Sequence, residues 1–520
     1  MTTGAQALIT SLLGGGVEVC FANPGTSEMH FVAALDDHPD MRAILCLFEG
    51  VATGAADGYW RVAGKPAATL LHLGPGLANG LANLHNARRA HSGVVNIVGD
   101  HATYHRSSGT PLASDIGLLG DWLDSPIARP QSSDDLAVAV MDTVAAARVG
   151  RIATLVLPAD VSWSKVSTPA FGPAASRSAD PRQPGAHDID LIAGRLTTLG
   201  DRALLLIGGA GTSATGLIAA QRISQAVGTR VLVETFPARL AHGRGVPNFE
   251  RLGYLSEQAV AQLAEVQELL LAGAQHPVGF FAYPDKPTDL VPEGAAVLTF
   301  AAPDNPHTAA ALERVADALD APAVALGTAV PAPELGTGPL TAWNWVGVIA
   351  NLLPDNAIIS DESNTSGLML PTATRACARH DLLTLTGGAI GQGLPVAIGA
   401  AVAAPDRPVI ALQADGSALY TITALWTMAR EHLDVTVVLL NNRAYAILQL
   451  ELQRVGAEPA GDRARQLLEL DDPDIDFVSI ARGLGVSAMR ATTVQELAHQ
   501  FQAAVHEPGP HLIEAMISPA

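Results

Sequence analysis

Two stretches in the last third of the chain decide the fold: VIALQADGS at residues 409–417 and VTVVLLNN at residues 435–442. Each is an apolar run of strand length that ends in polar side chains, Asp415 and Ser417 in the first and Asn442 in the second. Continuous apolar runs predict strands that are buried on both faces, as in a parallel sheet covered by helices. Because open parallel sheets bind ligands at the carboxyl ends of their strands, we expect a ligand site where these two strands end.

The same alternation of apolar strands and amphipathic helices extends over the whole chain of 520 residues. Further strands are expected at residues 17–21, 67–72, 94–98, 203–207 and 230–234, and a helix at residues 76–89. Two stretches rich in Pro, Gly and Ala, residues 168–188 and 331–339, are typical of linkers. We therefore predict an α/β fold of three consecutive doubly wound parallel-sheet domains, over residues 1–167, 189–330 and 340–520.

Composition and charge exclude several classes of protein. The chain has 31 Lys and Arg against 51 Asp and Glu, a formal net charge of −20, which repels nucleic-acid backbones. Its three cysteines show no paired spacing, which argues against a disulfide framework or a zinc cluster and fits a reducing compartment. The N-terminus lacks signal-peptide features, and the Gly-, Ala- and Pro-rich run at residues 386–405 is not typical of a spanning helix. We expect a soluble cytoplasmic protein with no nucleic-acid or membrane partner.

The polar residues at the two strand ends are suited to a metal ion. The carboxylate of Asp415 and the amide oxygen of Asn442 are hard oxygen donors of the kind that Mg²⁺ or Ca²⁺ prefers, and Mg²⁺ is commonly held by one or two carboxylates together with phosphate oxygens. Two such strand ends holding a metal over a diphosphate would form a coherent site. Two unrelated turns are the alternative, since Asp-Gly and Asn-Asn are ordinary turn dipeptides.

The pair of motifs has a known counterpart. Ala414-Asp415-Gly416, followed by 24 residues (417–440) and Asn441-Asn442, resembles the Gly-Asp-Gly-x(24–27)-Asn-Asn signature of thiamine diphosphate (ThDP) enzymes. Ala414 departs from this signature, because the first Gly is usual there. Over essentially its whole length the chain resembles the acetolactate synthase and benzoylformate decarboxylase family. This resemblance implies a pyrimidine-binding domain, a middle domain and a diphosphate-binding domain, in that order.

The resemblance implies ThDP and Mg²⁺ as cofactors, with Ca²⁺ as an alternative ion. The implied metal ligands are Asp415, Asn442 and the backbone carbonyl of Ala444, and the other implied ThDP contacts are Asn364, Thr365, Gly388, Ile390, Gly416 and Ser417. In the family, side chains at the positions of Asn364 and Thr365 bind the diphosphate. The backbone carbonyl at the position of Gly388 accepts a hydrogen bond from the 4′-amino group, and a bulky apolar side chain at the position of Ile390 keeps the cofactor bent. Helix capping is the alternative for Asn364 and Thr365, and core packing is the alternative for Ile390.

The resemblance also implies three catalytic residues in the first domain. Glu49, followed by small residues and by Ala-Asp-Gly-Tyr at 56–59, matches the family's glutamate that faces N1′ of the aminopyrimidine. A carboxyl group there exchanges a proton with the ring and turns its amino group into a base. Thr26 and His72 match substrate-side residues of the benzoylformate decarboxylase branch. The alternatives are a helix-start carboxylate favoured by the helix dipole for Glu49 and a hydrogen-bonded surface histidine for His72.

Other positions bear on the reaction. Val246 stands where the decarboxylase branch has a second histidine, and losing that proton donor disfavours simple decarboxylation. Asp100-His101 and residues 114–117 depart from the acetolactate synthase pattern. We expect a ThDP- and Mg²⁺-dependent carbon–carbon lyase or carboligase acting on small 2-oxo acids or vicinal diketones, with acetolactate synthase-like acyloin formation preferred. A benzoylformate decarboxylase-like 2-oxo acid decarboxylase and a non-catalytic ThDP-fold partner protein are the alternatives.

The middle segment carries a weak nucleotide-binding pattern. GAGTSA at residues 209–214 is formally G-x-G-x-x-A and follows a predicted strand. A dinucleotide site also needs an acidic residue about 20 positions further on. Glu234 lies 25 positions after Gly209, so we expect no FAD, and a nicotinamide oxidoreductase is the weakest alternative.

The resemblance has a consequence for assembly. In the family, ThDP bridges the first domain of one chain and the third domain of its partner. Glu49 and Asp415 would then reach one cofactor from two different chains. We expect a homodimer or homotetramer with active sites at the subunit interface, because a two-fold interface creates this site twice.

Overall fold

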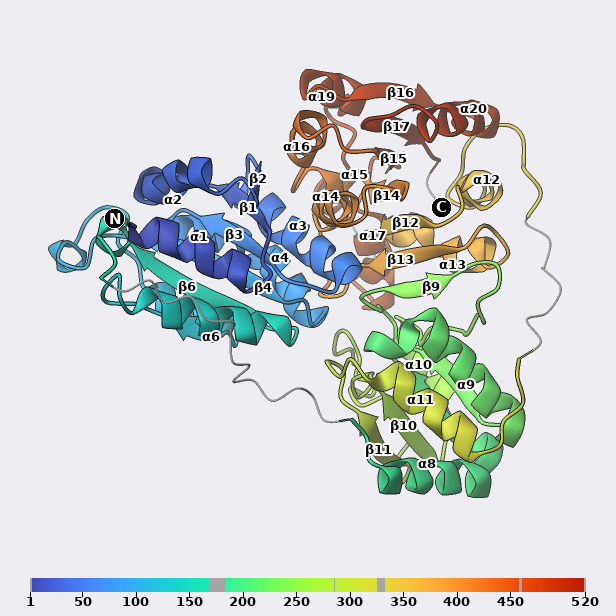
Figure 1. Ribbon diagram of the computed structural model, residues 1–520. Coiled ribbons are helices and arrows are strands. Elements are labelled where there is room, and N and C mark those ends of the chain that lie inside the picture. The colour runs from blue at the N-terminus through green and yellow to red at the C-terminus, as the bar shows by residue number, and fades with distance from the viewer. Residues whose placement is uncertain (1, 168–182, 285, 325–332, 458–460, 519–520) are drawn as a thin grey trace.

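The computed structural model describes residues 2–167, 183–284, 286–324, 333–457 and 461–518 (Figure 1). Most of the first predicted linker, residues 168–182, and the start of the second, residues 331–332, lie outside this range. Within the described range the chain forms three sheets, each flanked by helices, in three parts that follow one another along the sequence. No helix among the described residues is long and apolar enough to cross a bilayer.

The first sheet is wholly parallel, with strand order β2-β1-β3-β4-β6-β5. Its strands are β1 (Val19–Asn23), β2 (Arg42–Leu45), β3 (Ala67–Leu71), β4 (Val94–Asp100), β5 (Ile127–Ala128) and β6 (Ile152–Pro158). Its helices are α1 (Gly4–Gly14), α2 (Met29–Ala34), α3 (Glu49–Ala63), α4 (Leu73–Arg89), α5 (Ile116–Trp122), α6 (Leu136–Arg148) and α7 (Ala159–Trp163). The central strands β3, β4 and β6 are buried along their whole length, as expected for strands covered on both faces.

The middle sheet is also parallel, with strand order β11-β10-β7-β8. Its strands are β7 (Ala203–Ile207), β8 (Arg230–Val233), β10 (Glu268–Ala272) and β11 (Ala296–Ala301). The helices are α8 (Ala186–Leu199), α9 (Ala214–Val227), α10 (Ser256–Leu263) and α11 (Thr308–Ala318). The connection from β10 to β11 begins at the carboxyl end of β10, and its described residues, 273–284 and 286–295, contain no helix or strand.

The third sheet has seven strands in the order β16-β17-β15-β14-β12-β13-β9. Six of them are β12 (Ala357–Glu362), β13 (His380–Thr384), β14 (Val409–Ala414), β15 (Val435–Asn441), β16 (Ser487–Ala491) and β17 (His511–Met516). The helices are α12 (Trp345–Leu352), α13 (Leu370–Thr374), α14 (Gly393–Ala403), α15 (Asp415–Ala418), α16 (Ala424–Arg430), α17 (Ala446–Arg454), α18 (Asp462–Arg465), α19 (Phe477–Gly483) and α20 (Val494–Ala504).

The seventh strand, β9 (Leu240–His242), comes from the middle segment of the sequence and pairs antiparallel with β13. Leu240 lies opposite Leu382, and His242 lies opposite His380. The predicted fold class, three consecutive α/β sheets, is confirmed, and β9 is the addition that the sequence did not indicate. A strand this short carries no alternation of its own, so its pairing depends on the long-range contact with β13.

Helices α3 and α14 bring the first and third parts together within one chain. A Cβ on Gly58 would lie 2.2 Å from the carbonyl oxygen of Val396, and a Cβ on Gly399 would lie 2.0 Å from the carbonyl oxygen of Ala55. The two helices can approach this closely only because glycine stands at these positions. One core cluster continues through this contact, from strands of the first sheet to strands of the third.

Candidate active site

Asp415 joins the ends of β14 and β15, the two strands quoted at the outset. Its Oδ1 accepts a hydrogen bond from the N–H of Gly416 at 2.8 Å. Its Oδ2 accepts from the N–H groups of Asn442 at 3.1 Å and Arg443 at 2.7 Å. The side chain is only 2% exposed, so the carboxylate is held rigidly at the edge where both strands end.

The electrostatics of Asp415 favour a cation. Burial raises the pKa of this carboxyl to about 6, and the three backbone N–H donors oppose that rise. A nearby cation relieves the same desolvation penalty. The amide oxygen of Asn442 accepts from the N–H of Ala444 at 3.0 Å and keeps a second lone pair. One carboxylate, one amide oxygen and the carbonyl of Ala444 form a hard-oxygen donor set that fits Mg²⁺.

A buried polar network lies beneath this site and was missed by sequence reasoning. Gln413, fully buried on β14, donates through Nε2 to Ser417 Oγ at 2.7 Å and to Glu362 Oε2 at 2.9 Å. Glu362, at the end of β12, accepts from the N–H of Gly391 at 2.6 Å and of Gly393 at 2.7 Å. Burial raises the pKa of Glu362. The only sequence signal was an acidic residue at a strand end.

The expected diphosphate contacts lie around this network. Asn364 and Thr365 lie within a short 3₁₀ helix, Asn364–Gly367, that directly follows β12. Ser363 precedes that helix, so neither residue occupies the N-cap position. Ser417 and Gly416 lie in α15, where a Cβ on Gly416 would meet the Tyr445 ring at 2.5 Å. This contact explains why glycine stands at that position.

The loop that carries Gly388 and Ile390 joins β13 to α14 and is held by α4 of the first part. Asn86 donates from Nδ2 to the carbonyl of Ala389 at 2.7 Å and accepts from its N–H at 3.2 Å. Asn83 donates to the carbonyl of Gly391 at 3.3 Å and to that of Gly50 at 2.7 Å. Gly388 has a φ of +74°, which a glycine adopts without strain. Ile390 is half-buried at the surface of this loop rather than in the core.

Glu49 is the first residue of α3 and is 9% exposed. Its Oε2 accepts a hydrogen bond from Nδ2 of Asn79, on α4, at 3.0 Å. A Cβ on Gly76 would lie 3.1 Å from its Oε1, so the carboxyl group is enclosed by α4 on one side. A buried carboxyl with one donor partner can exchange a proton with a ring nitrogen placed against it.

His72 and Thr26 lie at the carboxyl ends of neighbouring strands of the first sheet. The Nδ1 of His72 lies 2.9 Å from Oε2 of Glu28, whose side chain is fully buried and also accepts from the N–H of Gly25 at 2.7 Å. Burial raises the pKa of Glu28, and the His72 contact opposes that rise. Thr26 is exposed beside this pair. Glu28 was missed as a partner of His72, because the two are 44 residues apart.

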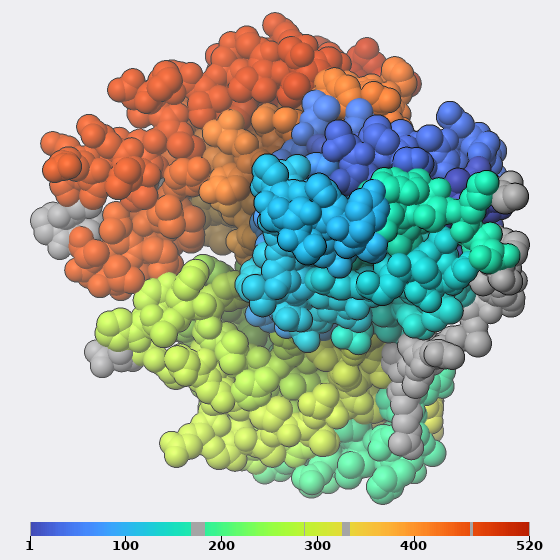
Figure 2. All heavy atoms as spheres, turned by 90° about the vertical axis from the view of Figure 1, so that its left-hand side faces the viewer, coloured from blue at the N-terminus to red at the C-terminus, as the bar shows by residue number. Residues whose placement is uncertain are grey.

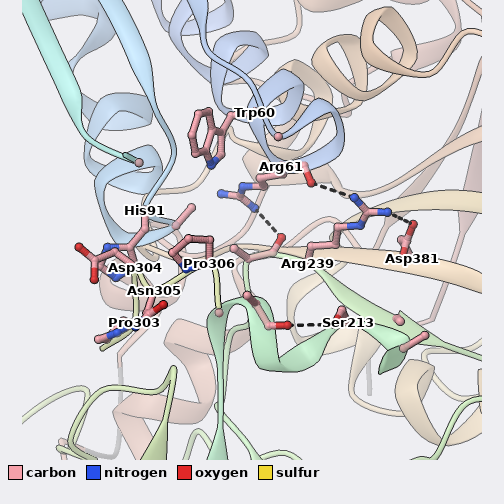
Figure 3. A pocket seen from close by; sticks show the side chains of 18 of the residues that line it. Trp60, Arg61, His91, Ser213, Arg239, Pro303, Asp304, Asn305, Pro306 and Asp381 are labelled. Carbon is pink, nitrogen blue, oxygen red and sulfur yellow. Dashed lines mark hydrogen bonds and ion pairs between the residues drawn. The ribbon is translucent and has the colours of Figure 1, made fainter. Parts of the chain in front are cut away.

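A separate cavity of about 910 Å³ lies where the three parts meet, and its lining does not include Asp415, Asn442 or Glu49 (Figure 3). Arg239 crosses it, donating to the carbonyl of Arg61 at 3.3 Å and pairing with Asp381 at 2.8 Å. The glycine-rich turn after β7 borders this cavity.

That glycine-rich turn already has a partner within the chain. The N–H of Gly209 donates to Oε1 of Glu234 at 3.0 Å. The side chain of Ser213 accepts from the N–H of Gly216 and so caps α9. Two of the N–H groups that a nucleotide phosphate would use in such a motif are therefore occupied by this chain's own side chains.

Comparison with known proteins decides the family. Residues 2–118 match the model of the thiamine pyrophosphate enzyme N-terminal TPP binding domain, and residues 370–515 match that of the C-terminal TPP binding domain. The chain belongs to the thiamine pyrophosphate enzymes. This finding confirms the resemblance and the enzyme class that the sequence motifs indicated.

Relatives come from both branches of the family. The chain is 54% identical over 516 residues to a Mycobacterium tuberculosis protein named "Putative acetolactate synthase large subunit IlvX", with 99% of each chain covered. It is 30% identical over 532 residues to benzoylformate decarboxylase of Pseudomonas aeruginosa, with 96% of each covered. The structure of a thiamine diphosphate-dependent 4-hydroxybenzoylformate decarboxylase of Rhodococcus jostii aligns over 100% of both chains, with a TM-score of 0.85 and 24% identity, and shows the shared fold.

Proposed function

We propose that the protein is a ThDP- and Mg²⁺-dependent carbon–carbon lyase or carboligase that acts on small 2-oxo acids or vicinal diketones and forms acyloins. The observation that carries this proposal is the buried Asp415 carboxylate, which joins the ends of β14 and β15 beside Asn442. A desolvated carboxylate at a strand edge, next to a second hard-oxygen donor, supports a metal-bound diphosphate.

Each group of residues has a defined task in this proposal. Bound ThDP supplies the carbanion and the electron sink. The metal is held by Asp415, Asn442 and the Ala444 carbonyl, the diphosphate by Asn364, Thr365, Gly416 and Ser417, and the pyrimidine by Gly388 and Ile390. Glu49 exchanges a proton with N1′ of the pyrimidine, and its enclosure by α4 excludes water from that proton.

His72 is the proton-transfer group on the substrate side. The carboxyl of Glu28 fixes the ring through Nδ1, so Nε2 is left to face the substrate, with Thr26 beside it. Bound ThDP would hold the electron pair left when a substrate loses CO₂ or an acyl group, and a second carbonyl compound would accept it. Val246, where the decarboxylase branch has a second histidine, is buried in an apolar core cluster and supplies no proton.

A 2-oxo acid decarboxylase remains a second candidate, and the contact between His72 and Glu28 favours it. A histidine backed by a carboxyl group is a competent proton donor for the step that ends decarboxylation. A non-catalytic partner protein is the weaker alternative, because a scaffold does not require the enclosed Glu49.

Calorimetric titration with ThDP and Mg²⁺ tests the cofactor site. We expect saturable binding in the native protein, its loss in Asp415→Ala, and unchanged binding in Asp406→Ala, which removes an exposed carboxylate of the same domain. Incubation with pyruvate, 2-oxobutyrate, benzoylformate and butane-2,3-dione, followed by mass spectrometry, separates acyloins from aldehydes. Absent ThDP binding, or binding that survives in Asp415→Ala, would show the proposal to be wrong.

We also propose the assembly and location of the enzyme. The active unit is a homodimer or homotetramer in which Glu49 of one chain faces Asp415 of its partner. Glu49→Gln and Asp415→Ala chains, each inactive alone, should regain activity when co-expressed. The three buried free cysteines support a reducing, cytoplasmic location. The functional domains span residues 1–167, 189–330 and 340–520.

A further inference from the structure

Asn441, the first residue of the asparagine pair at the end of β15, has no task in the proposed function. Its side chain is buried and directly precedes the proposed metal loop, residues 442–444. Its Nδ2 donates to Oε1 of Glu514, on β17, at 2.8 Å, and its Oδ1 accepts from the N–H of Arg443 at 3.1 Å. One buried amide therefore joins the metal loop to a carboxyl group on the neighbouring strand.

Glu514 is the centre of a row of polar side chains that crosses three neighbouring strands. It lies opposite Leu439 of β15 on one side and opposite Arg490 of β16 on the other. Its Oε2 accepts from Nε of Arg490 at 2.8 Å. Because side chains two residues apart on a strand share a face, Asn441 lies on the same face as Leu439. The row therefore consists of Arg490, Glu514 and Asn441, one residue from each strand.

The row leads from the surface of the third part to the metal loop. Figures 1 and 2 show the red end of the chain, which contains β16 and β17, at the top of the third part and away from the middle part. The side chain of Arg490 is 47% exposed there, and that of Glu514 is fully buried. An exposed arginine is thus connected through one buried carboxyl group to the amide that precedes the metal loop.

The surroundings of Glu514 are otherwise apolar. Leu439 and Leu512, on the same face, belong to the core cluster that continues from the first sheet to the third. A carboxylate in such surroundings is unfavourable unless its oxygens are paired. Both are paired, one with Arg490 and the other with Asn441. The position carries a charged group among apolar neighbours, and its hydrogen bond to Asn441 is the contact that reaches the metal loop.

The ion pair with Arg490 fixes the direction of each hydrogen bond in the row. Arginine only donates and a carboxylate only accepts, so Asn441 presents its NH₂ group to Glu514 and its oxygen to the N–H of Arg443. Arg443 has a φ of +59°, a left-handed conformation that a non-glycine residue keeps only where its surroundings hold it. Its N–H also donates to Asp415 at 2.7 Å. The row and the Asp415 carboxylate therefore hold one backbone group together.

We propose that Glu514 is a positioning residue for the metal site. It sets the orientation of the Asn441 amide and thereby holds the turn at Arg443. That turn presents the side chain of Asn442 and the carbonyl of Ala444 to the ion. This inference rests on the proposed function and adds a task for the first asparagine of the pair. Changes to residues that lie behind metal ligands typically weaken metal binding about 10- to 100-fold.

Glu514→Gln tests the orientation, because Arg490 still donates to the amide oxygen at position 514. The NH₂ group at that position then faces Asn441, whose amide turns round and directs its own NH₂ group at the N–H of Arg443. We expect Mn²⁺, a substitute for Mg²⁺, to bind about 10- to 100-fold more weakly than to the native protein. The measurement is electron paramagnetic resonance of free and bound Mn²⁺ in the presence of ThDP, which needs no turnover.

Glu268→Gln is the matched control. Glu268 is also a buried glutamate on a strand, and it pairs with the partly exposed Arg195 at 3.2 Å, but it lies on β10 of the middle sheet. This substitution should leave Mn²⁺ affinity unchanged, whatever it does to the urea midpoint. It separates an effect on the metal loop from a general effect of neutralising a buried carboxyl group.

The double variant Asn441→Asp with Glu514→Gln exchanges the donor and the acceptor and keeps the orientation. The amide at position 514 accepts from Arg490 and donates to the carboxylate at position 441, whose second oxygen accepts from the N–H of Arg443. This variant should recover most of the Mn²⁺ affinity that Glu514→Gln loses. Asn441→Asp alone sets two carboxylates against one another and should bind Mn²⁺ as weakly as Glu514→Gln does.

The outcomes separate the inference from the proposed function. Native Mn²⁺ affinity in Glu514→Gln, or a double variant that binds no better than Glu514→Gln, would overturn the inference. So would Asn441→Asp alone binding as well as the double variant, because added negative charge would then explain the recovery. That last comparison decides the matter even if Glu514→Gln alone does not fold. Native protein that binds no Mn²⁺ together with ThDP would refute the proposed function itself.

Discussion

The ion pair of Asp57 and Arg61 on α3 is predicted to be the most costly single contact to break at the boundary between the first and third domains, because Arg61 also bonds to the third. Both side chains are fully buried one turn apart on α3, with Arg61 Nε donating to Asp57 at 2.8 Å. Arg61 also donates to the carbonyl of Thr384 at 2.8 Å and to the hydroxyl of Thr386 at 3.0 Å. The pair therefore anchors the segment that leads into the loop of Gly388 and Ile390.

The expected loss of folding stability depends on which charge stays buried after the substitution. Arg61→Met removes the guanidinium and leaves the Asp57 carboxylate buried with Ser92 as its hydrogen-bond donor. Removing one partner of a buried ion pair lowers the free energy of unfolding by about 3–5 kcal/mol. The double variant Asp57→Asn with Arg61→Met removes both charges, so it should recover at least half of that loss. Arg89→Met, an exposed arginine of the same domain, should change stability by less than about 0.5 kcal/mol.

The assay is urea unfolding at fixed protein and ThDP concentration, followed by circular dichroism. The double-mutant cycle should give a coupling energy of about 1.5 kcal/mol or more between the two positions. If the losses of Asp57→Asn and Arg61→Met simply add, the side chains do not stabilise one another, and the account of this interface is wrong. A loss below about 1 kcal/mol for Arg61→Met would contradict it equally.

Three further outcomes follow from contacts already described. Burial raises the pKa of Glu28 above 4.5. The contribution of this group to folding stability is therefore fully present below pH 4.5 and is lost as the pH rises through the raised pKa. Glu28→Gln should flatten this pH dependence of the urea midpoint. Gly58→Ala places a methyl group 2.2 Å from the Val396 carbonyl oxygen and should lower the free energy of unfolding by about 1–3 kcal/mol. Gly194→Ala, in open space on α8, should raise it by about 0.5 kcal/mol. Equal effects of the two substitutions would refute the packing argument. His72→Ala should lower turnover about 10²–10⁴-fold without changing ThDP affinity in calorimetry, and undiminished turnover would exclude it as the proton-transfer group.

The strands could be predicted because each is a continuous apolar run that is visible in the sequence by itself. The apolar run before Asp415 and the one before Asn442 have the length and continuity of covered strands, and the structure has β14 and β15 within one residue of both. The polar residues at their ends could be paired in advance, because parallel strands that are neighbours end at the same edge. Motif spacing then identified the family.

Partners that are distant in sequence could not be predicted in the same way. Glu28 meets His72, and Gln413 meets Glu362, only after the sheets have formed, and neither sequence context marks a contact. Asp57 belongs to a motif that signalled the family, yet its side chain binds Arg61 and Ser92 rather than a cofactor. A sequence pattern shows that a residue matters without showing what it touches.

Strand β9 gives the middle domain a second connection to the third, beyond the covalent chain. It covers β13, whose outer backbone groups would otherwise form the open edge of a six-stranded sheet. An uncovered flat edge is a template for pairing between molecules. A shortened enzyme made by excising residues 189–330 would therefore expose β13 and aggregate, whereas one that retains Leu240–His242 as a tethered strand would keep its edge closed.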